Sequence, residues 1–328
     1  MSLPPSSKLI ADGIIVDLDD AQSAPSLDEA PVSTGLLLAQ LSLEAANGHN
    51  ETRVPPGQPY LLTQRGQWRT FDLAGYGFAS PVYGELSMAI SSDGSHVAFA
   101  DPSALVTVDL ADNTFKRFEL AAREAIMVTW SPDEASLLLK DRHDDRRPCG
   151  PTGCRLDLET GRLTPVPFNM FHSAYNDNGA VIEIQTPSRG RVGHVVTHHA
   201  DGSREAVPMP ASTVAYTAGG PAAARHVAYA QCGGRAGRRD TGVAVLSTTS
   251  GSALSMLTAP HLRGCRLGAR TWLDDHHLVV DDWMSGDMWL WDAKGKTTHQ
   301  LVESRTPSVN YDVAGTIMTK RFRHLLTP

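Results

Sequence analysis

One pattern occurs twice in the middle of the chain, as Ile90-Ser91-Ser92-Asp93-Gly94-Ser95-His96-Val97-Ala98-Phe99 and as Trp130-Ser131-Pro132-Asp133-Glu134-Ala135-Ser136-Leu137-Leu138-Leu139. An apolar residue opens each stretch, a polar turn follows, and an apolar run of strand length closes it. Asp accepts hydrogen bonds from the backbone of a turn and Gly tolerates positive φ, so both favour tight turns. Each stretch therefore predicts two antiparallel strands joined by a short turn.

The pattern continues beyond these two stretches. A third strand-like run follows each of them, Leu105–Leu110 after the first and Arg155–Gly161 after the second. Further copies open at Tyr175, Tyr216, Trp272 and Tyr311. Most copies are about 40–45 residues apart, which is the period of propeller blades with four strands each. Helical periodicity is nearly absent, so we expect an all-β fold.

We expect a β-propeller of four-stranded blades. A single blade cannot bury both of its faces, whereas neighbouring blades cover each other. Six copies predict six blades. The last copy, Ser308–Phe322, supplies two strands in this interpretation, and Tyr60–Thr63 and Trp68–Leu73 from the N-terminal side complete its blade and close the ring. If Gly13–Leu18 and Leu36–Leu43 also belong to the ring, the count becomes seven. We therefore expect an extended lead-in over residues 1–35 and one propeller domain over 36–328.

The W-S-P-D turn at Trp130–Asp133 makes a family resemblance specific. Together with S-S-D-G at 91–94 and the third strands V-x-V-D-L (106–110) and L-D-L-E-T-G (156–161), it resembles the WD40-like repeats of TolB-type propellers. The resemblance covers about residues 85–322 and departs from the pattern at Glu134, where glycine is usual, and in the copy at Tyr216. It implies protein–protein interaction in the bacterial cell envelope without intrinsic catalysis.

Composition narrows the classes of function. The chain has 328 residues, 41% of them hydrophobic, and a net charge of −7, which argues against a nucleic-acid partner. We find no run of about 18 apolar residues, so we expect no membrane span. The N-terminus lacks the features of a secretory signal. Either the protein is cytoplasmic, or an N-terminal signal or anchor is missing from this sequence.

The four cysteines bear on that choice. Cys149 and Cys154 flank a Gly-Pro-Thr-Gly turn, and Cys232 and Cys265 each lie beside glycine. An even number with one turn-flanking pair favours two disulfides, Cys149–Cys154 and Cys232–Cys265, and hence an extracytoplasmic protein. The alternatives are four unrelated buried thiols in a cytoplasmic protein and a zinc site, for which the spacing is poor.

We expect no catalytic residue, cofactor or metal. The G-x-S-x-G motif of α/β-hydrolases does not occur. Most adjacent carboxylates fall in predicted turns, where Asp is common. His276 and His277 would point to opposite faces of a strand and cannot chelate together, and the same holds for His198 and His199. The alternative is a propeller enzyme, of lyase, lactonase or glycosidase type, with a metal in the central channel.

The segment Asp281–Asp287 is the first candidate for a binding site. It joins the second and third strands of the blade that Trp272 opens, and such loops line one end face of a propeller. Trp283 and Met284, flanked by Asp281 and Asp282, could form a binding hot spot there. Alternatively, Trp283 packs over the blade edge.

Two arginine-rich loops occupy the equivalent place in other blades. One contains Arg146 and Arg147, and the other contains Arg235, Arg238 and Arg239. If these loops share one face with Trp283, the face has mixed charge and suits an unidentified protein partner. The alternatives are solvated, salt-bridged loops, or a carbohydrate-binding surface built on exposed tryptophans.

Overall fold

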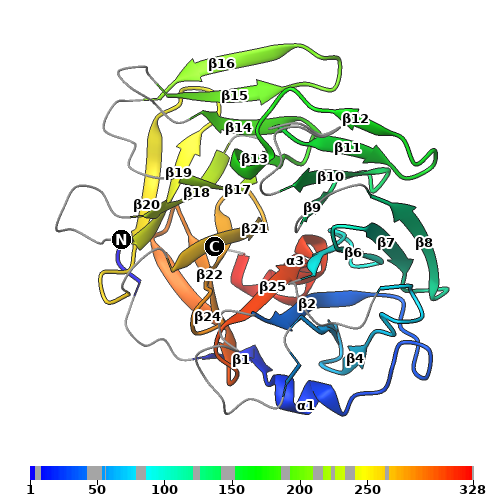
Figure 1. Cartoon of the computed structure of the whole chain (residues 1–328). Coiled ribbons are helices and arrows are strands. Elements are labelled where there is room, and N and C mark those ends of the chain that lie inside the picture. The colour runs from blue at the N-terminus through cyan, green and yellow to red at the C-terminus, as the bar shows by residue number, and fades with distance from the viewer. Residues whose placement is uncertain are drawn as a thin grey trace. The chain divides into compact units, whose positions relative to one another are not determined.

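The computed structural model describes residues 1–3, 9–42, 54–55, 57–78, 86–120, 126–141, 152–185, 193–209, 217–222, 226–232, 241–262 and 266–326 (Figure 1). Within these ranges the strands form six sheets. The pairs of neighbouring strands with an assigned register are antiparallel, and every sheet holds at least four strands. The fold is a six-bladed β-propeller, as the repeat predicts.

We number the blades along the chain. Blade 1 contains β5 (Ser87–Ile90), β6 (His96–Ala100), β7 (Ala104–Asp109) and β8 (Thr114–Glu119). Blade 2 contains β9 (Ile126–Trp130), β10 (Ser136–Asp141), β11 (Cys154–Asp157) and β12 (Leu163–Pro165). Blade 3 contains β13 (Ser173–Tyr175), β14 (Val181–Gln185), β15 (His194–His198) and β16 (Arg204–Pro208).

Blade 4 contains β17 (Thr217–Ala222), β18 (His226–Cys232), β19 (Thr241–Ser247) and β20 (Ala253–Thr258). Blade 5 contains β21 (Leu267–Trp272), β22 (His277–Asp282), β23 (Asp287–Asp292) and β24 (Thr297–Ser304), with β1 (Leu9–Val16) as a fifth strand beside β24. Blade 6 combines β25 (Val309–Val313) with β2 (Gly35–Leu41), β3 (Pro59–Thr63) and β4 (Trp68–Thr70).

N-terminal strands complete the last blade, as expected, but the division of strands differs. The C-terminal side supplies only β25, and β2 lies between β25 and β3 with Ala39 opposite both Tyr311 and Tyr60. The predicted second strand after Tyr311 is wrong, because Gly315–Arg321 is helix α3, which buries Ile317 and Met318. Both β1 and β2 belong to blades, but they do not add a seventh blade. β1 is a fifth strand of blade 5, and β2 takes the place in blade 6 of the strand that was predicted after Tyr311.

The copy assigned to Tyr216 is also misplaced. In a copy that opens at Tyr216 the repeat places a turn directly after that residue, but Thr217–Gly220 belong to β17, which pairs with β18 through a register shift between Gly219 and Ala222. A β-bulge accommodates glycine without ending a strand, so the glycine pair that suggested a turn marks an irregular strand instead.

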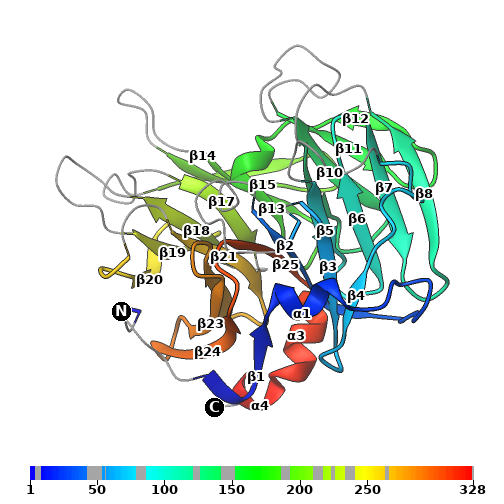
Figure 2. The same ribbon diagram turned by 60° about the horizontal axis from the view of Figure 1, so that its bottom comes forward.

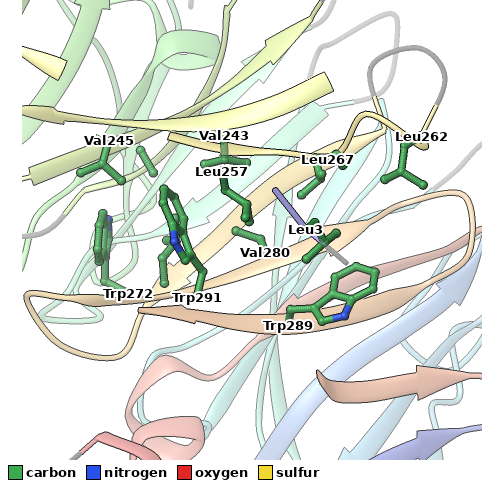
Figure 3. Packing of buried hydrophobic residues seen from close by; sticks show 13 residues of the cluster. Leu3, Val243, Val245, Leu257, Leu262, Leu267, Trp272, Val280, Trp289 and Trp291 are labelled. Carbon is green, nitrogen blue, oxygen red and sulfur yellow. The ribbon is translucent and has the colours of Figure 1, made fainter. Parts of the chain in front are cut away.

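Two compact units can be distinguished by their contacts. The first contains Met1–Gly13, Pro167–Trp283 and Asp287–Val302. Among its described residues, one cluster of buried side chains lies between the sheets of blades 4 and 5. There the rings of Trp272 and Trp291 point toward the strand that carries Val243 and Val245 (Figure 3). Trp289 and Trp291, both on β23, are 6% and 0% exposed and belong to this cluster.

The second unit contains Ile14–Val166, Met284–Gly286 and Glu303–Pro328. In it, Trp130, Leu137 and Leu139 of blade 2 pack against Ala98 and Leu105 of blade 1. The short helix α1 (Leu18–Gln22) lies beside β4, and α3 continues into α4 (Arg323–Leu326) at the end of the chain (Figure 2). Among the described residues, helices are too short or too polar to cross a bilayer.

Candidate functional site

The two acidic residues of the candidate site lie within a strand. Asp281 and Asp282 are the last residues of β22, and they are 0% and 2% exposed. The turn to β23 is therefore Trp283–Gly286, shorter than the loop expected from the sequence. Buried carboxylates need compensating charges or hydrogen bonds. The structure provides these from two arginines near the start of blade 5.

Asp282 is held by Arg266, which immediately precedes β21. Arg266 donates from Nε to Oδ1 of Asp282 at 2.8 Å and from Nη2 to Oδ2. Two parallel contacts to one carboxylate fix geometry as well as charge. The Arg266 carbonyl also accepts from the backbone N–H of Trp283 at 3.1 Å. This arginine therefore secures both the end of β22 and the first residue of the turn.

Asp281 is held by Arg270 on the neighbouring strand. The register between β21 and β22 shifts between Ala269 and Thr271, so Arg270 is the additional residue of a β-bulge. Its Nη2 lies 2.5 Å from Oδ2 of Asp281. The other carboxylate oxygen, Oδ1, has no hydrogen-bond partner among the described residues. A Cβ at Gly268 would lie 2.5 Å from that oxygen, so glycine at this position leaves room for the carboxylate.

The turn displays one apolar side chain and half-buries another. Met284 is 39% exposed, whereas Trp283 is of intermediate exposure. The Met284 carbonyl accepts from the backbone N–H of Ser308 at 2.8 Å. Gly286 has φ of 80°, and a Cβ there would lie 2.8 Å from Ser304. The turn is therefore tied to the segment that leads into β25, which fixes the backbone that carries Met284.

Arg266 and Arg270 were not identified from the sequence. Cross-strand neighbours of Asp281 and Asp282 can be counted back from the turn at Asp274 and Asp275, which points to residues near 267 and 268. Arg270 is not among these residues, and it reaches Asp281 from the β-bulge. The sequence pattern does not indicate that a bulge is present.

The remaining predicted site residues lie mainly outside the described ranges. These are Arg146, Arg147, Arg235, Arg238, Arg239, Cys149 and Cys265, and the side chain of Cys232 is also undescribed. Cys154 is fully buried at the start of β11, opposite Leu139. The two disulfides and the arginine-rich sectors therefore stay predictions.

A second buried acid lies in blade 3. Glu183 on β14 is 6% exposed, and its Oε2 lies 3.0 Å from Nε2 of His198. Burial alone would raise the pKa of Glu183. Hydrogen bonds from His198, from the backbone N–H of Asn169 and from Gln185 outweigh burial and hold that pKa below its usual value. Asn169 precedes β13, so this carboxylate ties the connection between blades 2 and 3 to a central strand.

The architecture is similar to known propellers. TolB from Acinetobacter baumannii matches with a TM-score of 0.52 and 16% identity over 88% of this chain and 69% of that chain. The fold is that of a TolB-like propeller. A putative TolB from Agrobacterium tumefaciens matches with a TM-score of 0.46 and 13% identity, covering 86% of this chain and 98% of that chain.

Structures of enzymes also match this chain. A prolyl endopeptidase structure matches with a TM-score of 0.45 and 15% identity over 78% of this chain but only 46% of that chain. No protein-family model matches the sequence, and no curated protein matches it. At these identities the similarity establishes only the fold of this chain. The function of this chain has to be argued from its own residues.

Proposed function

We propose that this TolB-like propeller is a non-catalytic binding module of the bacterial cell envelope that docks a protein partner at the β22–β23 turn. The observation that carries the proposal is an exposed Met284 and a half-buried Trp283 on a turn whose base is held by two ion pairs, each between a buried aspartate and a half-buried arginine. Tryptophan is enriched among residues that dominate binding energy, and methionine is enriched in interfaces.

The rigidity of the base supports this role. Binding is weakened by the entropy lost when a loop becomes ordered. Here the bidentate Arg266–Asp282 pair, the hydrogen bond from Ser308 to the Met284 carbonyl and the tight packing at Gly286 order the turn in advance. Little conformational entropy is then lost from this turn when a partner binds, so even a small apolar contact can contribute to affinity.

The same charges argue against catalysis at this place. Both aspartates are buried and neutralised by arginine, so neither is free to act as an acid or base on a bound molecule. They stabilise the strand end and leave recognition to the turn. If the predicted arginine-rich loops share one face with this turn, they would add positive charge to it, and the predicted disulfides would suit an extracytoplasmic location.

Site-specific photo-crosslinking tests the proposal. A photoreactive amino acid replaces Met284 in the full chain in living cells of the source organism, and a matched variant carries it at Phe115, which is 47% exposed on β8 of blade 1. We expect one envelope protein to be crosslinked from position 284 and not from position 115. The partner is then purified and its binding to the unmodified chain is measured directly.

Other outcomes decide against the proposal. Identical crosslinking patterns from both positions would show that the turn is not a specific docking site. Saturable quenching of tryptophan fluorescence by an oligosaccharide, lost in Trp283→Ala, would make the turn part of a carbohydrate-binding surface instead.

A further inference from the structure

A separate group of metal-binding side chains lies where blades 1 and 2 meet. Asp93 and His96 come from the β5–β6 turn and the start of β6, and Glu134 comes from the β9–β10 turn. One donor atom from each of the three side chains lies within 4.8 Å of the other two. Imidazole and carboxylate groups of this kind are ordinary ligands of zinc and related ions.

His96 faces a carboxylate on each side of its ring. Nδ1 lies 2.9 Å from Oε2 of Glu134, and Nε2 lies 3.5 Å from Oδ2 of Asp109. A neutral imidazole has only one N–H and can satisfy only one of these carboxylates. Asp109 is 36% exposed and accepts from the backbone N–H of Ala111 at 2.9 Å, so it does not require a charge from His96. On the other side of the ring, Nδ1 and Oε2 of Glu134 can bind one metal ion together when the ring proton is on Nε2, and the Ser95 hydroxyl lies 2.7 Å from Nδ1.

Asp109 resembles the outer partner of a metal-bound histidine. Histidines that bind a metal through one nitrogen commonly donate the other N–H to a carboxylate, which fixes the orientation of the ring. With the proton on Nε2 toward Asp109, the lone pair of Nδ1 points to Glu134. The ring of Trp130, 5.8 Å from the His96 ring between centroids, further limits how the imidazole can turn.

Asp93 is fixed as a second carboxylate. Its Oδ1 accepts from the hydroxyl of Ser91 at 2.8 Å and from the backbone N–H and hydroxyl of Ser95 at 2.8 and 2.7 Å. These three hydrogen bonds orient the Asp93 carboxylate, one donor oxygen of which lies within 4.8 Å of the donor atoms of His96 and Glu134.

Glu134 occupies a position that the repeat gives to glycine. Its φ is 57°, and the equivalent Gly94 in blade 1 has φ of 74°. A side chain in this left-handed region costs stability that glycine avoids. The strained residue places its carboxylate against His96 of the neighbouring blade, where it completes the three-ligand group.

We propose that Asp93, His96 and Glu134 bind one divalent first-row transition ion, for which Zn²⁺ is the best fit. Two carboxylates and one imidazole supply three ligands, and water or the Ser95 hydroxyl completes a tetrahedral site. The ion links the first turn of blade 1 to the first turn of blade 2. It therefore stabilises the packing between these blades, independently of the β22–β23 turn and of any partner.

Isothermal titration calorimetry of tag-free, metal-stripped protein with Zn²⁺ tests the site, and thermal unfolding with and without Zn²⁺ is the second readout. We expect one site per chain and a higher melting temperature with Zn²⁺. His96→Ala and Glu134→Gly should each weaken binding by about tenfold or more, in line with the loss of a ligand. Glu134→Gly also restores the residue type of Gly94, so the variant should fold.

His277→Ala is the matched control, because His277 also opens the second strand of a blade and pairs with an Asp of its own turn, at 2.9 Å from Asp274. Its affinity for Zn²⁺ should equal that of the wild type. Equal affinity in the His96→Ala variant would overturn the proposal, as would the absence of a binding isotherm at 100-fold molar excess of Zn²⁺ over a folded wild type.

Discussion

Arg266 binds the carboxylate of Asp282 through both Nε and Nη2, and its own carbonyl accepts from the backbone N–H of Trp283. One residue thus neutralises a buried acid at the end of β22 and fixes the start of the turn that follows. The candidate binding turn depends on this pair for its shape, although Arg266 itself need not touch a partner.

Removal of Arg266 should destabilise the protein strongly. In Arg266→Ala the carboxylate of Asp282, 2% exposed, loses its counter-charge; breaking a fully buried pair costs about 3–5 kcal/mol, and because Arg266 is 26% exposed we expect a loss toward the lower end of that range. Equilibrium unfolding in urea measures the change. Arg266→Lys keeps the charge but not the bidentate geometry, so its free energy of unfolding should lie between those of the wild type and Arg266→Ala. An unchanged unfolding midpoint in Arg266→Ala would contradict the structural role of this pair.

Trp283→Ala should separate recognition from stability. Because Trp283 is only half-buried, we expect its truncation to lower the free energy of unfolding by about 1 kcal/mol or less while weakening partner binding. The matched variant is Trp291→Ala, whose ring is fully buried in blade 5 and whose loss should cost about 3–5 kcal/mol. If both variants melt at the same reduced temperature, Trp283 is a core residue and not a recognition residue.

Gly286→Ala should disturb the turn more than its φ alone explains. Gly286 and Gly66 have φ of 80° and 74°, so alanine at either position costs about 1–2 kcal/mol of backbone strain. At Gly286 a Cβ also lies 2.8 Å from Ser304, whereas at Gly66 it meets nothing within 4 Å. The difference between the two variants in thermal unfolding isolates the packing of the turn, and equal losses would show that this packing is loose.

Acid should weaken blade 3 through Glu183. Its pKa is lower in the folded protein than in the unfolded chain, where it is near the usual glutamate value of 4.5. The stabilisation is therefore complete above pH 4.5 and is lost as pH falls through the lower, folded pKa. In Glu183→Gln the unfolding free energy should fall less steeply over this acidic range than in the wild type. Parallel curves for the two proteins would show that Glu183 does not contribute.

The architecture was predicted well because the blade repeat is defined by residues that are close together in the sequence. An apolar residue before an Asp- or Asn-rich turn, as at Trp130 and Asp133, is a local signal, and the structure confirms it in blades 1, 2, 3 and 5. Completion of blade 6 by β3 and β4 followed from counting strands. Two predictions were wrong because they extended the repeat to residues that do not follow it. A strand was predicted where α3 lies, and a turn was predicted at the glycine pair in β17.

The candidate site was predicted in position but not in chemistry. Trp283 and Met284 do occupy the β22–β23 turn, yet the acids beside them are buried and paired. Which arginine meets which aspartate depends on a bulge at Arg270, and a bulge depends on the packing of both strands. The group at Asp93, His96 and Glu134 was missed for a similar reason, because its members meet across two blades.

The most direct test of the docking proposal is the dissociation constant of the protein crosslinked at position 284, measured with purified components. The account predicts that Trp283→Ala and Met284→Ala, each confirmed as folded by circular dichroism, weaken this binding by about tenfold or more, while Phe115→Ala leaves it unchanged. Equal affinities for the wild type and both turn variants would contradict the account, because the β22–β23 turn would then not be where the partner binds.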